Sequence, residues 1–99
     1  MTTKAPTMTP WGKADEQREL APGIIKVYTP SHGGIWLAPE RYAQMPEEQR
    51  QTAYSAGGWY EEDCDWALVA TRFPEAFNPQ QQAEAASIMA RYFPQFANN

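Results

Sequence analysis

The stretch of sequence that most constrains the fold runs from Gly57 to Phe73, where two glycines, a group of carboxylates and a dense apolar run follow one another. Acidic side chains are favoured in the first turn of a helix, because the unpaired backbone N–H groups there carry partial positive charge. From Cys64 onward, apolar residues cover most of the helical circumference, as in helices that are buried on several sides. Pro74 ends the run. We therefore predict a central helix here, with the rest of the chain packed around it.

The length and composition are those of one small globular domain. A chain of 99 residues can bury a single core but not a deep substrate cavity as well, and a 42% apolar fraction rich in aromatics is unlike that of disordered chains. The net charge of -4 argues against direct nucleic-acid binding, which depends on Lys and Arg. No apolar run has the length of a membrane span or a signal peptide. We expect a cytoplasmic protein without membrane contact.

Strands are predicted in the first half of the chain. The segment Ile24–Thr29 is rich in β-branched and aromatic residues, and Ile35–Leu37 follows it after a loop that contains two glycines. This pattern predicts an antiparallel hairpin over residues 24–37. The weakly alternating segment Ala14–Ala21 is predicted to be an exposed edge strand.

Helices are predicted in the second half. Prolines at first-turn positions predict short helices over Pro39–Gln44 and Pro46–Tyr54, and the pair Asn78-Pro79 starts an amphipathic helix that Pro94 ends. Residues 1–10 show no periodicity and are expected to form a flexible arm. Residues 11–99 should form a single α+β domain, in which a small antiparallel sheet of two to three strands packs against three to four helices.

One candidate site is the loop with His32, Gly33 and Gly34. Two adjacent glycines permit positive φ angles and allow a ligand to approach the backbone closely. The same residues also suit a simple tight turn, in which the imidazole is a structural hydrogen-bond partner. The sequence leaves both interpretations open, and the tight-turn interpretation predicts a positive φ at one of the glycines.

A catalytic interpretation combines Cys64 as nucleophile with His32 as base and Asp63 or Asp65 to orient the base. The surrounding carboxylates disfavour a thiolate, so the nucleophile would be poor. A metal site that uses Glu61, Asp65 and His32 lacks a strong motif, and helix capping explains these acids without an ion. We therefore predict no catalytic residue, no metal and no cofactor.

Aromatic residues are more numerous than a core of this size needs. Trp and Tyr are enriched at binding hot spots, and rings rimmed by carboxylates form a surface on which a protein can dock. Alternatively, the rings complete a small core and its edges. The candidate partner-binding residues are the acids near helix starts and the neighbouring aromatics: Glu47, Glu48, Trp59, Tyr60, Glu61 and Glu62.

Four blocks of sequence carry a resemblance to a known family. They are Thr9–Ala14, Ala21–Ile24, Thr29–Gly34 and Gly58–Ala67. Through them the chain resembles a family of small uncharacterised domains carried by bacteriophages and plasmids, over nearly its whole length. The resemblance brings no established activity. Because small acidic proteins of such mobile elements often inhibit host defence, it implies an inhibitor of a bacterial immune system, such as an anti-CRISPR or antirestriction protein.

Together these observations predict a non-enzymatic inhibitor, in particular an anti-CRISPR protein, that docks on an effector protein in the cytoplasm of a bacterial host cell. The effector is expected to have a basic, nucleic-acid-handling surface, because complementary charge speeds encounter. The alternative is a small hydrolase or metal-assisted enzyme that uses His32, Cys64 and Asp63 or Asp65. DNA mimicry is disfavoured, because the acids are interspersed with Lys and Arg.

Overall fold

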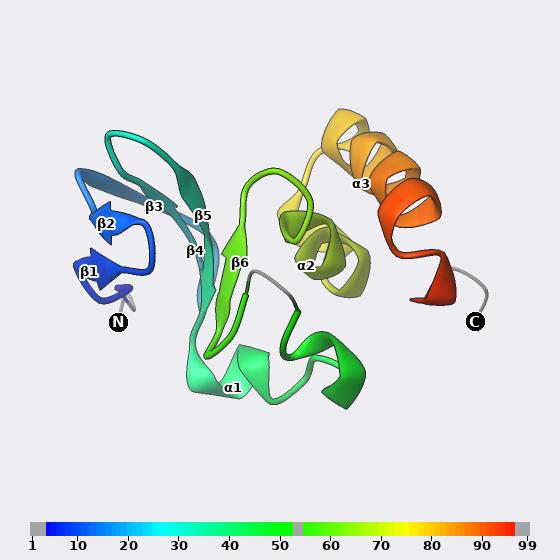
Figure 1. Ribbon diagram of the computed structural model, residues 1–99, viewed down its shortest axis with the longest axis horizontal. Helices are drawn as coiled ribbons and strands as arrows, with labels where there is room; N and C mark the ends of the chain where they lie inside the picture. Colours follow the sequence, from blue (N-terminus) through cyan, green and yellow to red (C-terminus); the bar gives the residue numbers. More distant parts are fainter. Residues whose placement is uncertain (1–3, 53–54, 97–99) are drawn as a thin grey trace.

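A four-stranded antiparallel sheet separates two layers in the computed structural model, which describes residues 4–52 and 55–96 (Figure 1). Its strands stand in the order of the sequence, β3 (Glu16–Ala21), β4 (Ile24–Tyr28), β5 (Gly33–Leu37) and β6 (Trp59–Glu61). The fold is α+β, as predicted, but the main sheet has four strands instead of the two to three expected.

The predicted hairpin over residues 24–37 is confirmed. Ile24 pairs with Leu37 and Tyr28 pairs with Gly33, so the loop consists of the four residues between β4 and β5. Thr29 Oγ1 closes this loop by donating to the His32 carbonyl at 2.6 Å and accepting from the His32 N–H at 3.0 Å. The predicted edge strand is also confirmed, because β3 pairs on one side with β4 and forms one edge of the sheet.

Gly33 and Gly34 do not form the tight turn that we predicted. Both lie within β5 and are buried, and neither has a positive φ. They are glycines because neighbouring atoms come close. A Cβ at Gly33 would lie 2.7 Å from the Val27 carbonyl oxygen, and one at Gly34 would collide with the Trp11 ring and the Tyr60 carbonyl. Steric space rather than backbone conformation therefore requires glycine at these two positions.

The predicted central helix begins later than expected. Helix α2 runs over Trp66–Arg72, whereas Trp59–Glu61 forms strand β6 and pairs with β5. The carboxylates therefore lie at a strand end and in the turn that follows, not in the first turn of a helix. Strand pairing overrides the helical pattern here because β5 offers a free edge to the incoming segment. The prediction for the apolar part was right, since Ala67, Leu68, Val69 and Ala70 are all buried.

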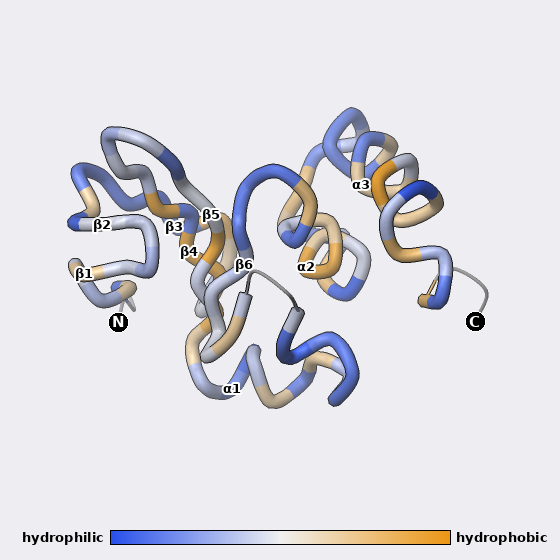
Figure 2. Tube along the Cα trace, viewed as in Figure 1, coloured by the Kyte–Doolittle hydropathy of each residue, from blue (hydrophilic) through white to orange (hydrophobic). Residues whose placement is uncertain are grey.

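The main core lies between the sheet and the helices. Figure 1 shows α2 between the sheet and α3 (Pro79–Tyr92), and α2 contacts β5, β6 and α3. In Figure 2 the hydrophobic colours gather in α2 and in the middle of the sheet. Ile24, Ile35 and Leu37 from the sheet and Met89 from α3 close this core around α2. Helix α2 is covered on two sides, which explains why its surface is apolar almost all round.

The other helical segments are short, apart from α3. Helix α1 covers Pro39–Tyr42, and single 3-10 turns cover Glu47–Gln49, Pro74–Ala76 and Pro94–Phe96. The two helices predicted before the central helix are thus shorter than expected, and the end of the second, Tyr54, lies outside the described residues. At the start of α3, the predicted cap is confirmed. The Asn78 side chain accepts from Gln81 N–H, and the Gln81 side chain accepts from Asn78 N–H.

A second, smaller core covers the opposite face of the sheet. The segment before β3 includes β1 (Met8–Thr9) and β2 (Gly12–Lys13), which pair with each other. Ala5 is buried against this face, and its N–H donates to the Gln17 side chain at 2.9 Å. The residues of this core are Ala5, Ile25 and Val27, with Trp11, Trp36 and Trp59 packed around them. The flexibility predicted for residues 1–10 stays a prediction, since these contacts do not measure motion.

Within the described ranges, no helix has the length and apolar character needed to cross a lipid bilayer.

Candidate functional site

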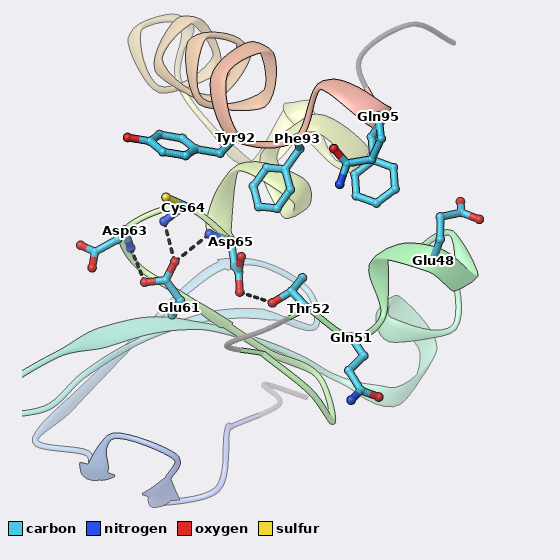
Figure 3. A pocket seen from close by; sticks show the side chains of 11 residues that line it. Glu48, Gln51, Thr52, Glu61, Asp63, Cys64, Asp65, Tyr92, Phe93 and Gln95 are labelled. Atoms are coloured by element: carbon cyan, nitrogen blue, oxygen red, sulfur yellow. Dashed lines mark hydrogen bonds between the residues drawn. The ribbon is translucent and has the colours of Figure 1, made fainter.

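A pocket of about 660 Å³ lies between the turn that follows β6 and the C-terminal end of α3 (Figure 3). Figure 3 shows the rings of Tyr92 and Phe93 on one side and the acidic turn on the other. The lining residues are Glu48, Gln51, Thr52, Glu61, Asp63, Cys64, Asp65, Tyr92, Phe93, Gln95 and Phe96. Four of them are carboxylates, and no described Lys, Arg or His is among them.

Glu61 fixes the acidic wall of the pocket. Its carboxylate accepts three backbone hydrogen bonds, from Asp63 N–H at 2.8 Å, Cys64 N–H at 2.6 Å and Asp65 N–H at 3.0 Å. Hydrogen bonds to a charged acceptor are stronger than neutral ones, so this side chain holds the whole turn in place. The acids of the turn are therefore positioned by the edge of the sheet, to which Glu61 belongs.

Asp65 anchors the turn by accepting hydrogen bonds from hydroxyl groups. It is 2% exposed, and its Oδ2 accepts from Thr52 Oγ1 at 2.6 Å and from Ser55 Oγ. The Ser55 hydroxyl oxygen in turn accepts from Glu61 N–H at 3.2 Å. A buried carboxylate requires such donors, because its desolvation is otherwise costly. Asp65 is thus a structural residue beneath the pocket surface, whereas Asp63 and Glu48 are exposed at its rim.

The opposite wall is aromatic. Tyr92 is 52% exposed and, with Met8, is one of two large hydrophobic side chains exposed among the described residues. Phe93 and Phe96 stack with ring centroids 6.2 Å apart. The Arg91 guanidinium carbon lies 5.5 Å from the Tyr92 ring centroid. This wall comes from the last turn of α3 and the 3-10 turn after it, about thirty residues beyond the acidic turn in the sequence.

Cys64 has the wrong electrostatic surroundings for a nucleophile. Burial raises the pKa of its thiol, and the nearby charges of Glu61, Asp65 and Asp63 raise this pKa further. A raised pKa means that less thiolate is present at neutral pH than for a free cysteine. The alternative triad also lacks support, because Cys64 and His32 line no common pocket and no hydrogen bond joins them among the described residues.

His32 lies in a different place. It is exposed, and its Nδ1 is 3.8 Å from Glu62 Oε1. It lines a smaller pocket of about 370 Å³, which shares Glu61 and Asp63 with the large pocket. Exposed pairs of this kind contribute little to stability. Across the part of the chain that the structure describes, no group of three or more His, Cys, Asp or Glu residues is arranged to hold a metal ion.

The comparison with known families gives one result. A family model described as "Domain of unknown function (DUF7007)" matches residues 4–98. The chain belongs to this DUF7007 family. The match covers nearly the whole chain and agrees with the resemblance to an uncharacterised domain family seen in the sequence. No curated protein and no solved structure matches the chain significantly.

The structure of this DUF7007 domain separates the predicted partner-binding residues. Glu48 and Glu61 line the large pocket, while Glu47 is exposed in the 3-10 turn nearby. Glu62 is exposed beside His32. The two aromatic residues of the prediction, Trp59 and Tyr60, do not line this pocket.

Tyr60 is fully buried in the main core, and its hydroxyl donates to the Gln49 carbonyl at 2.7 Å. It therefore has no surface to offer a partner in this conformation. Trp59 lies on the opposite face of the sheet, edge-on to Trp11 with ring centroids 5.7 Å apart. The aromatic residues that do line the acidic pocket are Tyr92, Phe93 and Phe96, and none of them was among the predicted partner-binding residues. The signal for the first two was a Tyr-Phe pair directly before Pro94, at the end of an amphipathic helix.

Proposed function

We propose that this DUF7007 domain is a non-enzymatic docking protein that inhibits a bacterial immune system, most specifically as an anti-CRISPR protein. It binds a host effector on that effector's basic, nucleic-acid-handling surface. The observation that carries the proposal is the large pocket, whose exposed rim joins carboxylates to an exposed aromatic ring. Aromatic anchors surrounded by polar residues are typical of protein-binding hot spots.

The charge of the pocket supports a basic partner. Glu48 and Asp63 are exposed at the rim and free of basic neighbours in the pocket lining, within the described ranges. The whole chain carries a net charge of -4, so the long-range field also favours a cationic partner. Rim charges act mainly on the rate of encounter, whereas a central ring such as that of Tyr92 acts on the lifetime of the complex.

The enzymatic alternative has less support. A thiol mechanism needs a thiolate and a base within hydrogen-bonding reach, but Cys64 has a raised pKa and His32 lines another pocket. The immune target is supported by the resemblance to domains of bacteriophages and plasmids, which contribute inhibitors of host defence. The docking chemistry is supported by the pocket.

The proposal is tested by phage plating. The chain is expressed in a panel of bacterial strains, each of which uses one CRISPR effector type against a targeted phage. We expect the protein to restore plaques in at least one strain. His32→Ala should keep this activity, as should Cys64→Ser, which removes the thiol but keeps the size of a side chain that lines the pocket, and the double reversal Glu48→Lys with Asp63→Lys should lower it. Glu84→Lys is the matched control, because Glu84 is an exposed carboxylate of α3 outside this pocket.

Two results would overturn the proposal. If folded, expressed protein leaves phage plating unchanged in every strain of the panel, inhibition of CRISPR immunity is wrong. If plaques are restored but His32→Ala and Cys64→Ser each abolish the effect, while both variants remain folded, the docking mechanism is wrong and an enzymatic mechanism replaces it.

A further inference from the structure

The two walls of the large pocket differ in chemistry and face each other. Asp63 and Glu61 stand on one side in Figure 3, and the Tyr92 ring stands on the other. A planar cation satisfies both walls at once, since its edge can donate to carboxylates while its face stacks on a ring. Arginine has this shape, whereas the lysine ammonium is a compact, strongly hydrated point charge.

We propose that the pocket takes an arginine side chain of the partner protein, with the guanidinium between the Tyr92 ring and the rim carboxylates. This inference rests on the proposed docking function and specifies the chemical group that is recognised. Arginine is also the residue that nucleic-acid-handling surfaces use for bidentate contacts to phosphate. An arginine held in this pocket is withdrawn from that role.

The size and the charge of the pocket fit this occupant. A volume of about 660 Å³ is within the range of ligand pockets, so it accommodates an arginine together with the flanking peptide. The described lining residues include four carboxylates and no Lys, Arg or His, so the lining itself carries an excess of acidic groups. Charge complementarity thus selects a cationic occupant, and the ring selects a planar one.

The same pairing of guanidinium and ring occurs elsewhere in the molecule. The Arg41 and Arg72 guanidinium carbons lie 4.9 Å and 5.3 Å from the Phe73 ring centroid. The Arg91 guanidinium lies over the Tyr92 ring but does not line the pocket. Because Tyr92 as a residue is 52% exposed, it still has accessible surface for a second contact. These internal contacts are examples, within this fold, of the guanidinium–ring half of the proposed arrangement.

The experiment is an NMR titration of the isotope-labelled full chain with three small probes. N-acetyl-arginine methylamide is the ligand, N-acetyl-citrulline methylamide is its neutral isostere, and N-acetyl-lysine methylamide carries the same charge without the planar group. We expect saturable shifts with the arginine probe at the amides of Asp63–Asp65 and Tyr92–Phe96. A single side chain should bind with a dissociation constant on the order of millimolar.

The variants separate the two walls. Tyr92→Ala should weaken binding of the arginine probe by about three- to tenfold, through loss of the stacking contact. Asp63→Asn should weaken it through loss of charge, while Glu84→Gln, outside the pocket, should change nothing. Both pocket residues are exposed, so these substitutions leave the fold intact. The chemical shifts of the remaining residues check this directly.

Several results would overturn the inference. Equal binding of arginine and citrulline removes the role of charge, and equal binding of arginine and lysine removes the role of the planar group. Chemical-shift changes spread over all surface acids, or binding that Tyr92→Ala does not weaken, would place the arginine contact outside this pocket.

The two proposals can also fail separately. Arginine binding without any effect on phage plating leaves the pocket assignment standing and rejects immune inhibition. Restored plaques that Tyr92→Ala does not reduce, without arginine binding, reject the pocket assignment alone.

Discussion

Trp11 lies directly on Gly34, and its indole ring fills the space that a Cβ atom at Gly34 would need. The contact joins the N-terminal segment to β5, on the face of the sheet that the helices do not cover. The Tyr60 carbonyl oxygen in β6 approaches the same Cβ position. One glycine thus allows three segments of the chain to meet at van der Waals distance.

Gly34→Ala should therefore destabilise the protein. Adding a methyl group to a tightly packed site costs about 1–3 kcal/mol, because the neighbours must shift. Chemical denaturation measures this loss. Trp11→Ala provides the control background, since the cost of Gly34→Ala should fall there, with only the Tyr60 carbonyl left to obstruct the methyl group. An unchanged unfolding curve for Gly34→Ala would contradict this account.

Leu68 in α2 tests whether this helix is the centre of the main core. It is fully buried between the sheet and α3, and its truncation leaves a cavity. Leu68→Ala should lower the free energy of unfolding by about 2–5 kcal/mol, as for other buried leucines. Ser87→Ala, on the exposed side of α3, should stay within about 0.5 kcal/mol of the wild type. Similar losses for the two variants would mean that α2 is not the centre of the core.

Glu61 gives a prediction about local order. Glu61→Ala removes the acceptor of three backbone N–H groups, so it should cost about 1–3 kcal/mol and release the turn. Hydrogen exchange at the amides of Asp63, Cys64 and Asp65 should become faster. Glu62→Ala is the matched control, because Glu62 is exposed and 3.8 Å from the His32 ring. Equal exchange rates in the two variants would show that charge, rather than hydrogen bonding, orders the turn.

Tyr60 gives a prediction about alkaline pH. Burial raises the pKa of its hydroxyl above the ordinary value of 10.0, with further contributions from Tyr42 and Asp65. A raised folded-state pKa means that the stabilisation is complete below pH 10 and is lost as pH rises toward the folded-state value, because only the unfolded chain ionises readily. Above pH 10, the wild type should lose about 1.4 kcal/mol per pH unit more than Tyr60→Phe.

The stabilities of the wild type and Tyr60→Phe should also differ at neutral pH. There Tyr60→Phe should lower the free energy of unfolding by about 1 kcal/mol, through loss of the hydrogen bond to Gln49. Denaturation at several alkaline pH values measures both effects. Since the two proteins differ only at residue 60, the difference between their curves isolates Tyr60. Parallel curves across this range would refute the claim that Tyr60 stays neutral in the folded state.

Local patterns predicted the elements that local chemistry determines. The β-branched run at Ile24–Thr29 marked the hairpin, and the Asn78-Pro79 pair marked the start of α3. The start of the central helix was wrong because Trp59–Glu61 carries no local mark that distinguishes a strand from the first turn of a helix. Its pairing with β5 decides the outcome, and that pairing joins residues about twenty-five positions apart.

Some residues of the acidic wall of the pocket were predicted from the sequence, and none of the aromatic wall. Of the pocket's four carboxylates, Glu48 and Glu61 were among the predicted partner-binding residues, whereas Asp63 and Asp65 were not. Its aromatic wall was not predicted, because Tyr92 reaches the acidic turn only after α3 has packed on α2. A sequence pattern shows that Tyr92 and Phe93 end an amphipathic helix, but not which segment faces them. The placement of Tyr60 inside the core likewise depends on the strand alternation of β6, which the helical interpretation concealed.

The three hydrogen bonds to Glu61 also have a genetic consequence. Because one carboxylate orients the backbone of the whole turn, the effects of substitutions at Asp63 and Cys64 should depend on whether Glu61 is present, and mutations at these neighbouring positions should not add. A library that varies the turn should tolerate many residues at position 63 in the Glu61 background and far fewer without it. Restoring negative charge at a neighbouring position should not rescue the loss of Glu61, since it returns the charge without the acceptor geometry.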